Sequence, residues 1–147
     1  MGNTVEVIIA CIERCQGEEK KMAEAKFYRC EHCGAIVYVV EDKGVTPSCC
    51  GEPMTLLKAN TTDGATEKHV PVVSRDGFKL TVKVGEVAHP MLPEHYIEFI
   101  ALETEQGINL KRLNPGETPE AHFALPENQG GVAYEFCNLH GLWKAEF

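Results

Sequence analysis

The sequence predicts an all-β protein in which a small metal-binding unit precedes an antiparallel β-sandwich. Three observations support this fold class. Four cysteines lie close together in a segment with little apolar content, apolar and polar residues alternate in the second half of the chain, and turn residues separate the alternating runs. Alternation with a period of two is typical of strands that bury one face.

The composition is that of a globular protein and excludes several classes. Of the 147 residues, 44% are hydrophobic and 24% are charged, which excludes a disordered chain. The net charge of −8 opposes a nucleic-acid partner, and no apolar run approaches the roughly 20 residues that span a membrane. No secretory signal is evident, and the seven cysteines are odd in number. We therefore expect a cytoplasmic protein with metal-bound thiolates rather than disulfides.

Composition divides the chain into four regions. Residues 1–26 are expected to be a leader, of which 1–21 are not native, and 27–58 hold the clustered cysteines. Residues 59–68 are small and polar and indicate a linker, after which 69–147 form the β region. A charged run before Met22 corresponds to purine-rich codons that resemble a ribosome-binding site. We expect Met22 to be the true start; the alternative is a short amphipathic helix.

The β region contains seven short runs that favour strands. The clearest alternates for seven residues, and turn residues such as Asn114-Pro115-Gly116 separate the runs. The predicted strands are Val70–Ser74, Phe78–Val84, Tyr96–Leu102, Ile108–Leu113, Ala121–Leu125, Val132–Phe136 and Leu142–Phe147. This number and spacing predict a sandwich of immunoglobulin type. No helix is expected after residue 26.

The clustered cysteines predict a four-thiolate metal site. Cys30 and Cys33 form a C-x-x-C pair, and Cys49 and Cys50 follow as adjacent residues. A C-x-x-C turn lets two thiolates reach one ion, and the second pair completes a tetrahedral shell that suits zinc or a single iron. Adjacent ligands are expected to strain that shell. His32 lies between two ligands and is expected to be exposed rather than a fifth ligand.

Histidines and one further cysteine gather at turns of the β region. His69 opens it, His89 and His95 flank a proline-stiffened loop, and Cys137 and His140 lie in the last turn. Loops at one end of a sandwich converge in space, so these residues favour a second metal site.

Several sequence strings resemble those of desulfoferrodoxin, the two-iron superoxide reductase. They are EKHVPVV, VAHPMLPEHYIEFI and CNLHGLWK, and the CEHCG…CCG segment is similar to the desulforedoxin-like domain of that family. The resemblance covers residues 27–147. It implies a desulforedoxin-like iron domain followed by a catalytic sandwich.

The resemblance also implies roles for individual residues. It implies four equatorial ligands and an axial thiolate to iron, carried by His69, His89, His95, His140 and Cys137. One coordination position then stays open. Lys68 would attract superoxide and organise a proton-donating water, and Glu67 would bind the oxidised iron after peroxide leaves. Without the resemblance, Glu67 and Lys68 would be a solvated charge pair in a linker. His122 matches no ligand and is expected on a sandwich face.

The activity implied by the resemblance is the one-electron reduction of superoxide to hydrogen peroxide. The implied cofactors are two irons per chain, one at each site. A rubredoxin-like electron donor and a homodimer are implied as well. The alternatives are superoxide dismutation and a two-centre electron carrier. A zinc-ribbon adaptor would explain only residues 27–58.

Overall fold

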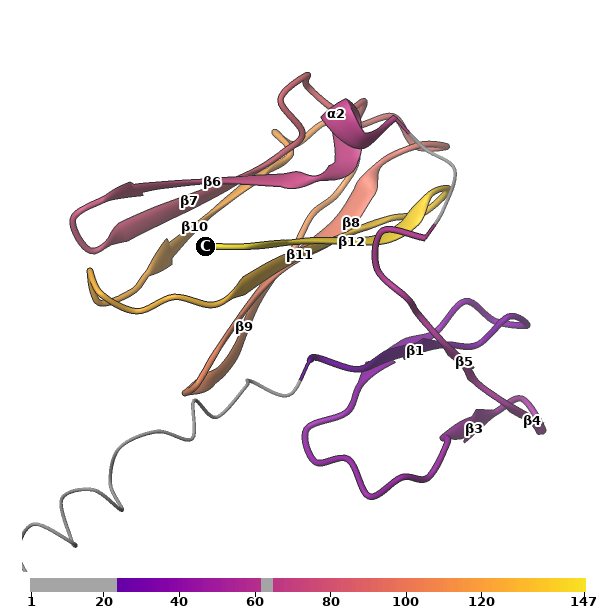
Figure 1. Ribbon diagram of the computed structural model, residues 1–147. Helices are drawn as coiled ribbons and strands as arrows, with labels where there is room; N and C mark the ends of the chain where they lie inside the picture. The colour runs from indigo at the N-terminus through magenta and orange to yellow at the C-terminus, as the bar shows by residue number, and fades with distance from the viewer. Residues whose placement is uncertain (1–23, 62–64) are drawn as a thin grey trace, which may run out of the picture.

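The protein is described by a computed structural model that covers residues 24–61 and 65–147 (Figure 1). The strands are β1 Phe27–Arg29, β2 Ile36–Tyr38, β3 Ser48–Cys49, β4 Glu52–Pro53, β5 Thr55–Leu56, β6 Pro71–Asp76, β7 Lys79–Val84, β8 Ile97–Thr104, β9 Gly107–Arg112, β10 Glu120–Ala124, β11 Val132–Cys137 and β12 Gly141–Glu146. Within these two ranges the one helix is α2, Thr66–His69. No helix of the described residues is long and apolar enough to cross a membrane.

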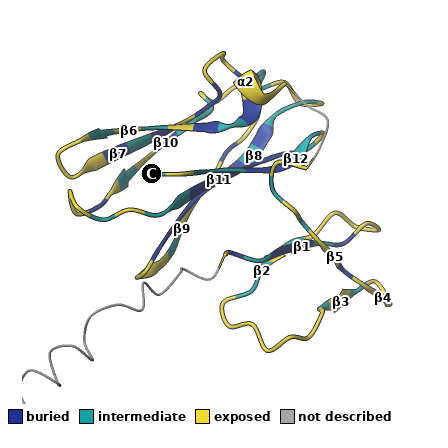
Figure 2. Ribbon diagram, viewed as in Figure 1, coloured by how far each residue is buried: buried dark blue, intermediate teal, exposed yellow. Residues whose placement is uncertain are grey.

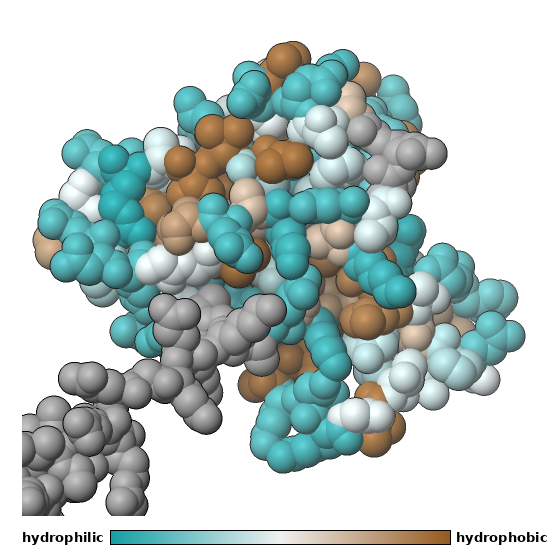
Figure 3. Space-filling model, in the orientation of Figure 1, coloured by the Kyte–Doolittle hydropathy of each residue, from teal (hydrophilic) through white to brown (hydrophobic). Residues whose placement is uncertain are grey.

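The second half of the chain forms the predicted antiparallel sandwich. All seven expected strands are present, as β6 to β12. One sheet has the order β10-β7-β6 and the other β12-β11-β8-β9. The residues fully buried between the sheets include Val82, Ile100 and Ala133. The face of the molecule shown in Figure 3, in contrast, is largely hydrophilic, with apolar side chains between the hydrophilic ones. The predicted all-β, immunoglobulin-like fold class is confirmed.

The N-terminal unit covers the outer face of the four-stranded sheet. It is built from short strands that pair as β2-β1-β5 and β3-β4. The Phe27 ring is 1% exposed, and its centroid lies 5.5 Å from that of Phe99 and 5.6 Å from that of Tyr134. Strands β8 and β11 are therefore buried on both faces (Figure 2), which explains why β8 is a largely apolar run instead of an alternating one.

A buried carboxylate fixes the chain where it enters β1. The backbone N–H of Ala25 donates to Glu103 Oε2 at 2.9 Å, and the Tyr134 hydroxyl donates to the same oxygen at 3.2 Å. Burial raises the pKa of Glu103. Of the expected leader, only residues 24–26 are described here. The expected start at Met22 lies outside the described residues and stays a prediction.

The segment expected to be a linker is held at both ends. The Asn60 N–H donates to the Leu142 carbonyl at 3.0 Å, and its side chain exchanges two hydrogen bonds with the backbone of Lys144. At the other end lies α2, so the expectation of no helix after residue 26 is wrong. The helix is a single turn, closed by a 3.0 Å hydrogen bond from the Val70 N–H to the Thr66 carbonyl. Four residues are too few to show a helical period in the sequence.

The turn after β7 holds α2 against the sandwich through backbone hydrogen bonds. The Val87 N–H donates to the Glu67 carbonyl at 3.1 Å, and the Gly85 N–H donates to the Val70 carbonyl at 3.2 Å. Gly85 has φ +74°, and a Cβ at this position would lie only 2.6–2.7 Å from backbone atoms of Lys68. A glycine is required here because any side chain would push α2 away from the sandwich.

We predict that Gly85→Ala destabilises the fold more than Gly116→Ala. Both glycines have positive φ, so both substitutions cost roughly 1–2 kcal/mol for a left-handed alanine. Nothing lies within 4 Å of a Cβ at Gly116, whereas Gly85→Ala must also displace Lys68, at a further cost of about 1–3 kcal/mol. Denaturant unfolding of the two variants measures the difference. Equal losses would contradict the close approach of Gly85 to α2.

Candidate metal centres

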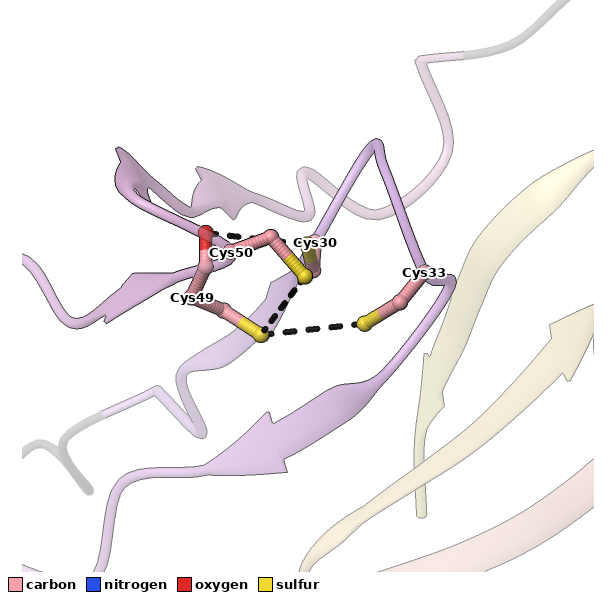
Figure 4. Close-up of side chains that lie close together, drawn as sticks. All are labelled: Cys30, Cys33, Cys49 and Cys50. Atoms are coloured by element: carbon pink, nitrogen blue, oxygen red, sulfur yellow. Dashed lines mark hydrogen bonds between the residues drawn. The ribbon is translucent and has the colours of Figure 1, made fainter.

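Four cysteine side chains of the N-terminal unit point toward one another (Figure 4). Cys30 and Cys33 come from the turn after β1, and Cys49 and Cys50 from the β3–β4 hairpin. The Cys49 sulfur lies 3.7 Å from that of Cys33 and 3.9 Å from that of Cys50. A tetrahedral ion with metal–sulfur bonds of about 2.3 Å places its sulfurs about 3.8 Å apart. The group therefore fits one tetrahedral metal ion.

The backbone of Cys50 shows how two adjacent residues face one point. Cys50 has φ +53° and is followed by Gly51 with φ +83°. A non-glycine residue in this left-handed region costs roughly 1–2 kcal/mol. The backbone of Cys50 is therefore strained, whereas the expected strain of the metal shell stays a prediction. His32 is exposed, as expected, and lies outside the ligand group.

Backbone amides favour a thiolate at Cys30. The N–H groups of Cys33 and then His32 hydrogen bond to its sulfur and lower the pKa of Cys30 to about 6. The thiolate is the form that binds a metal. The C-x-x-C turn therefore favours the ionised form of one ligand.

Four histidine rings form a closed cycle at one end of the sandwich. In order around it, the centroids are 4.7 Å apart for His69–His89, 4.6 Å for His89–His95, 4.9 Å for His95–His140 and 4.7 Å for His140–His69. Neighbouring ring planes are inclined by 61–80°. Potential ligand atoms of His69, His89 and His140 lie within 4.8 Å of one another and of the Cys137 sulfur. His95 falls outside that group but completes the cycle.

Different elements deliver the four rings. His69 ends α2, and His140 lies in the turn between β11 and β12. His89 and His95 flank the proline-containing loop before β8, where Leu92 and His95 exchange backbone hydrogen bonds of 2.9 and 3.0 Å. The predicted convergence of loops at one end of the sandwich is what brings these residues together.

Cys137 lies beside this cycle at the end of β11. It is fully buried, and its sulfur is 3.6 Å from His140 Nδ1. The pairing of β11 with β8 shifts register between Phe136 and Cys137, which re-aims the chain at this point. Burial raises the pKa of Cys137, so metal binding must displace its proton.

Hydrogen bonds outside the cycle fix the tautomers of two rings. His69 Nδ1–H donates to Glu135 Oε1 at 3.3 Å, and His89 Nδ1–H donates to the Pro90 carbonyl at 2.6 Å. These bonds leave Nε2 of each ring as a lone-pair donor. His89 Nε2 and His95 Nε2 are buried without a hydrogen-bond partner among the described residues, which is what metal ligands require. The residues therefore fit a metal ion.

Glu135 is a site residue that sequence reasoning missed. It is fully buried in β11, and this burial raises its pKa well above the usual value. The signal in the sequence is a glutamate inside the otherwise apolar run of this strand. Only the fold reveals that its carboxylate meets His69.

His69 and His89 are held in the neutral form. Burial is the main cause that lowers the pKa of His69 and His89 to about 4, and the neighbouring imidazoles add to it. Both rings therefore present lone pairs at neutral pH. Because these folded-state pKa values are depressed, the stability tied to the neutral rings is present above about pH 6.5 and is lost as the pH falls toward 4.

The remaining candidate residues lie as follows. Glu67 and Lys68 are exposed on α2, directly before His69. His122 is exposed on β10, where it contacts Thr81 at 3.0 Å, so the expectation that it belongs to a sandwich face is confirmed.

Comparisons with known proteins agree over nearly all of the described chain. Residues 23–57 match the family profile of the desulfoferrodoxin N-terminal domain, and residues 61–146 match that of desulfoferrodoxin. The desulfoferrodoxin of Nitratidesulfovibrio vulgaris is 51% identical over 124 residues, which are 82% of this chain and 95% of that protein. The desulfoferrodoxin homolog of Archaeoglobus fulgidus is 46% identical over 118 residues, or 80% and 94% of the two chains.

A solved structure aligns with most of the chain. The crystal structure of the superoxide reductase from Treponema pallidum aligns with a TM-score of 0.70 at 41% identity, covering 84% of this chain and 99% of that one. Each unit, with its group of metal-binding side chains, thus matches a model of the desulfoferrodoxin family, and this chain belongs to that family.

Proposed function

We propose that this chain is a superoxide reductase that converts superoxide to hydrogen peroxide. The observation that carries this proposal is the cycle of four imidazoles beside one buried thiol, in a member of the desulfoferrodoxin family. Two relatives named as superoxide reductases support it. They are the Treponema pallidum structure and a Pyrococcus horikoshii protein that is 38% identical over 102 residues, 57% of this chain and 89% of that protein.

Two irons would bind the two groups of side chains. Iron at the catalytic centre would be held by His69, His89, His95, His140 and Cys137, and iron at the second centre by Cys30, Cys33, Cys49 and Cys50. The chemistry supplied by the first iron when bound is the transfer of one electron to superoxide. Superoxide also takes up two protons and leaves as hydrogen peroxide. The chain's task is to attract an anion and deliver protons to it.

We assign Lys68 to the attraction of the substrate. It is exposed on α2 next to His69, and its positive charge is among the causes that lower the pKa values of His69, His89 and His95. The ammonium therefore contributes a local positive charge at the imidazole cycle, against a net charge of −8. We assign Lys68 to the capture of superoxide and the ordering of a proton-donating water.

Glu67 shares the exposed turn with Lys68. It is the acidic residue of α2, and we assign it to occupy the site after peroxide has left. The seat formed by Gly85 and Val87 fixes the backbone of both residues, which supports a defined position for their side chains.

The same family membership supports the organisation and context of the enzyme. We assign residues 27–58 to the four-cysteine iron domain, 59–68 to the linker and 69–147 to the catalytic sandwich. The electron donor is a rubredoxin-like protein, and the chain acts as a cytoplasmic homodimer.

The ratio of peroxide formed to superoxide consumed tests the activity. A reductase supplied with excess electron donor approaches one peroxide per superoxide, whereas a dismutase gives one half. A value of one half for the iron-loaded protein would replace the proposal with superoxide dismutation.

The two centres are expected to bind metal independently. Cys49→Ser removes a thiolate from the four-cysteine group only, so iron content should fall from two to about one per chain while the histidine centre keeps its iron. Peroxide formation with a chemical reductant should persist, since every ligand of the catalytic centre lies in the sandwich. Metal analysis and visible spectra check this. Loss of iron from both centres would show that they are interdependent.

The Cys137 thiolate is expected to control activity rather than folding. Cys137→Ser changes one buried atom in a core that many strand residues define, so far-UV circular dichroism should stay native. A serine hydroxyl is a poor donor to this iron, so the thiolate-to-iron charge-transfer absorption and most turnover should be lost. Turnover near the native rate would remove Cys137 from the ligand set.

The charge of Lys68 is expected to set the salt dependence of the reaction. An ammonium about 6 Å from the anion contributes roughly 3 kcal/mol at an effective dielectric of about 20, and exposure reduces this to about 1.4 kcal/mol, a tenfold change in rate. Lys68→Ala should therefore slow the second-order reaction with superoxide about tenfold. Added salt should slow the native enzyme but slow the variant less, since only the acidic background remains.

The control is Lys79→Ala, which removes an exposed lysine from the start of β7. Its rate and salt dependence should stay native. Pulse radiolysis at several ionic strengths gives both quantities. The same salt slope for native protein and Lys68→Ala would leave Lys68 as a solvated residue without a role in capture.

A further inference from the structure

Trp143 is the one tryptophan of the chain and contacts two members of the histidine cycle. It is 2% exposed in β12, and its indole stacks on His69 with centroids 5.0 Å apart and planes inclined by 13°. Its Nε1–H also donates to the His140 carbonyl at 3.1 Å. One side chain thus touches the ring of one ligand and the backbone of another.

The strand register gives this contact a second partner. Trp143 and Glu135 are direct neighbours across the β11–β12 pair, and Glu135 accepts the hydrogen bond from His69 Nδ1. The Glu135 carboxylate holds Nδ1 of His69 and so leaves Nε2 facing the histidine cycle. The flat face of the Trp143 indole fixes the plane of the His69 ring. Neither contact alone determines both the tautomer and the orientation.

The hydrogen bond to His140 acts on the backbone of the last turn. His140 follows Cys137 by three residues, and its Nδ1 lies 3.6 Å from the Cys137 sulfur. A donor that holds the His140 carbonyl therefore restrains the turn that carries both a ring and the thiol. The indole links this turn to α2, from which His69 comes.

We propose that Trp143 is a positioning residue of the catalytic metal centre, holding the plane of His69 and the backbone of His140. It thereby raises the affinity of the centre for its metal ion. The proposal rests on the ligand set assigned above and not on the reaction. A peroxide ratio of one half would contradict the proposed function but not the role of Trp143, and an unchanged metal affinity would contradict the role of Trp143 but not the proposed function. Partners outside the ligand set typically change metal affinity about 10- to 100-fold.

Two substitutions separate the contacts of the indole. Trp143→Phe keeps an aromatic face against His69 but lacks the N–H donor, and Trp143→Leu lacks both. The matched control is Phe99→Leu, which removes a buried aromatic side chain packed toward the N-terminal unit. The iron-loaded proteins are incubated with graded concentrations of a chelator. Visible and electron paramagnetic resonance spectra then report the iron left at each centre, and the four-cysteine centre serves as an internal reference.

We expect the dissociation constant of the histidine centre to rise about 10- to 100-fold in Trp143→Leu and less in Trp143→Phe. Phe99→Leu should leave it unchanged. Melting temperatures of the metal-free proteins distinguish lost positioning from lost folding, because Trp143→Phe keeps most of the packing. Native affinity in both Trp143 variants would overturn the proposal, as would equal losses in Trp143→Leu and Phe99→Leu. Native affinity in Trp143→Phe alone would overturn the hydrogen-bond part.

Discussion

Strand β11 pairs with β8 on one side and β12 on the other. Its side chains alternate between the two faces of the sheet, and each face contacts a different part of the molecule. Tyr134 and Phe136 point to the outer face, where they pack with Phe27 of the N-terminal unit. Glu135 and Cys137 lie at the other face, where they meet His69 and His140. A slip of one residue would exchange these two sets, so the register of β11 maintains both the docking of the small unit and the catalytic centre.

Burial of His69 and His89 favours a metal ion at the histidine cycle. Burial depresses the pKa values of both rings, and His89 Nε2 has no hydrogen-bond partner among the described residues. Such a nitrogen is costly in a protein interior unless something accepts its lone pair. The same low polarity keeps protons away from the nitrogens. The fold is thus poised toward metal binding by groups that would otherwise destabilise it, and its outer hydrogen bonds determine which nitrogen is offered.

The sequence was sufficient to predict the sandwich and the two clusters of cysteine and histidine residues, for different reasons. Alternation of apolar and polar residues reveals strands such as β7 because one face of the strand is buried and the other faces solvent. The cysteine and histidine clusters stand out because their residue types are rare in turns. Two other features depend on contacts between residues that are not neighbours in the chain. They are the packing of α2 against Gly85 and the hydrogen bonds that hold Asn60 to β12. No local pattern encodes such contacts.

The two residues that support His69 show the same limit. Glu135 is visible as a charged residue in an apolar strand, but its partner could not be named before the fold placed α2 above β11. Trp143 appears in the sequence as an ordinary core residue. Its importance comes from a cross-strand pairing and from the loop geometry that brings a ligand ring onto its face.

A single tryptophan beside one of two metal centres also makes the chain its own spectroscopic probe. Fluorescence emission from Trp143 reports on the end of the sandwich where the histidines lie. It does not report directly on the four-cysteine unit, because that unit contains no tryptophan. Circular dichroism, in contrast, averages over both units. If Phe27 couples the two units tightly, the two signals will follow one denaturation curve, and any separation between the curves measures how far the small unit unfolds by itself.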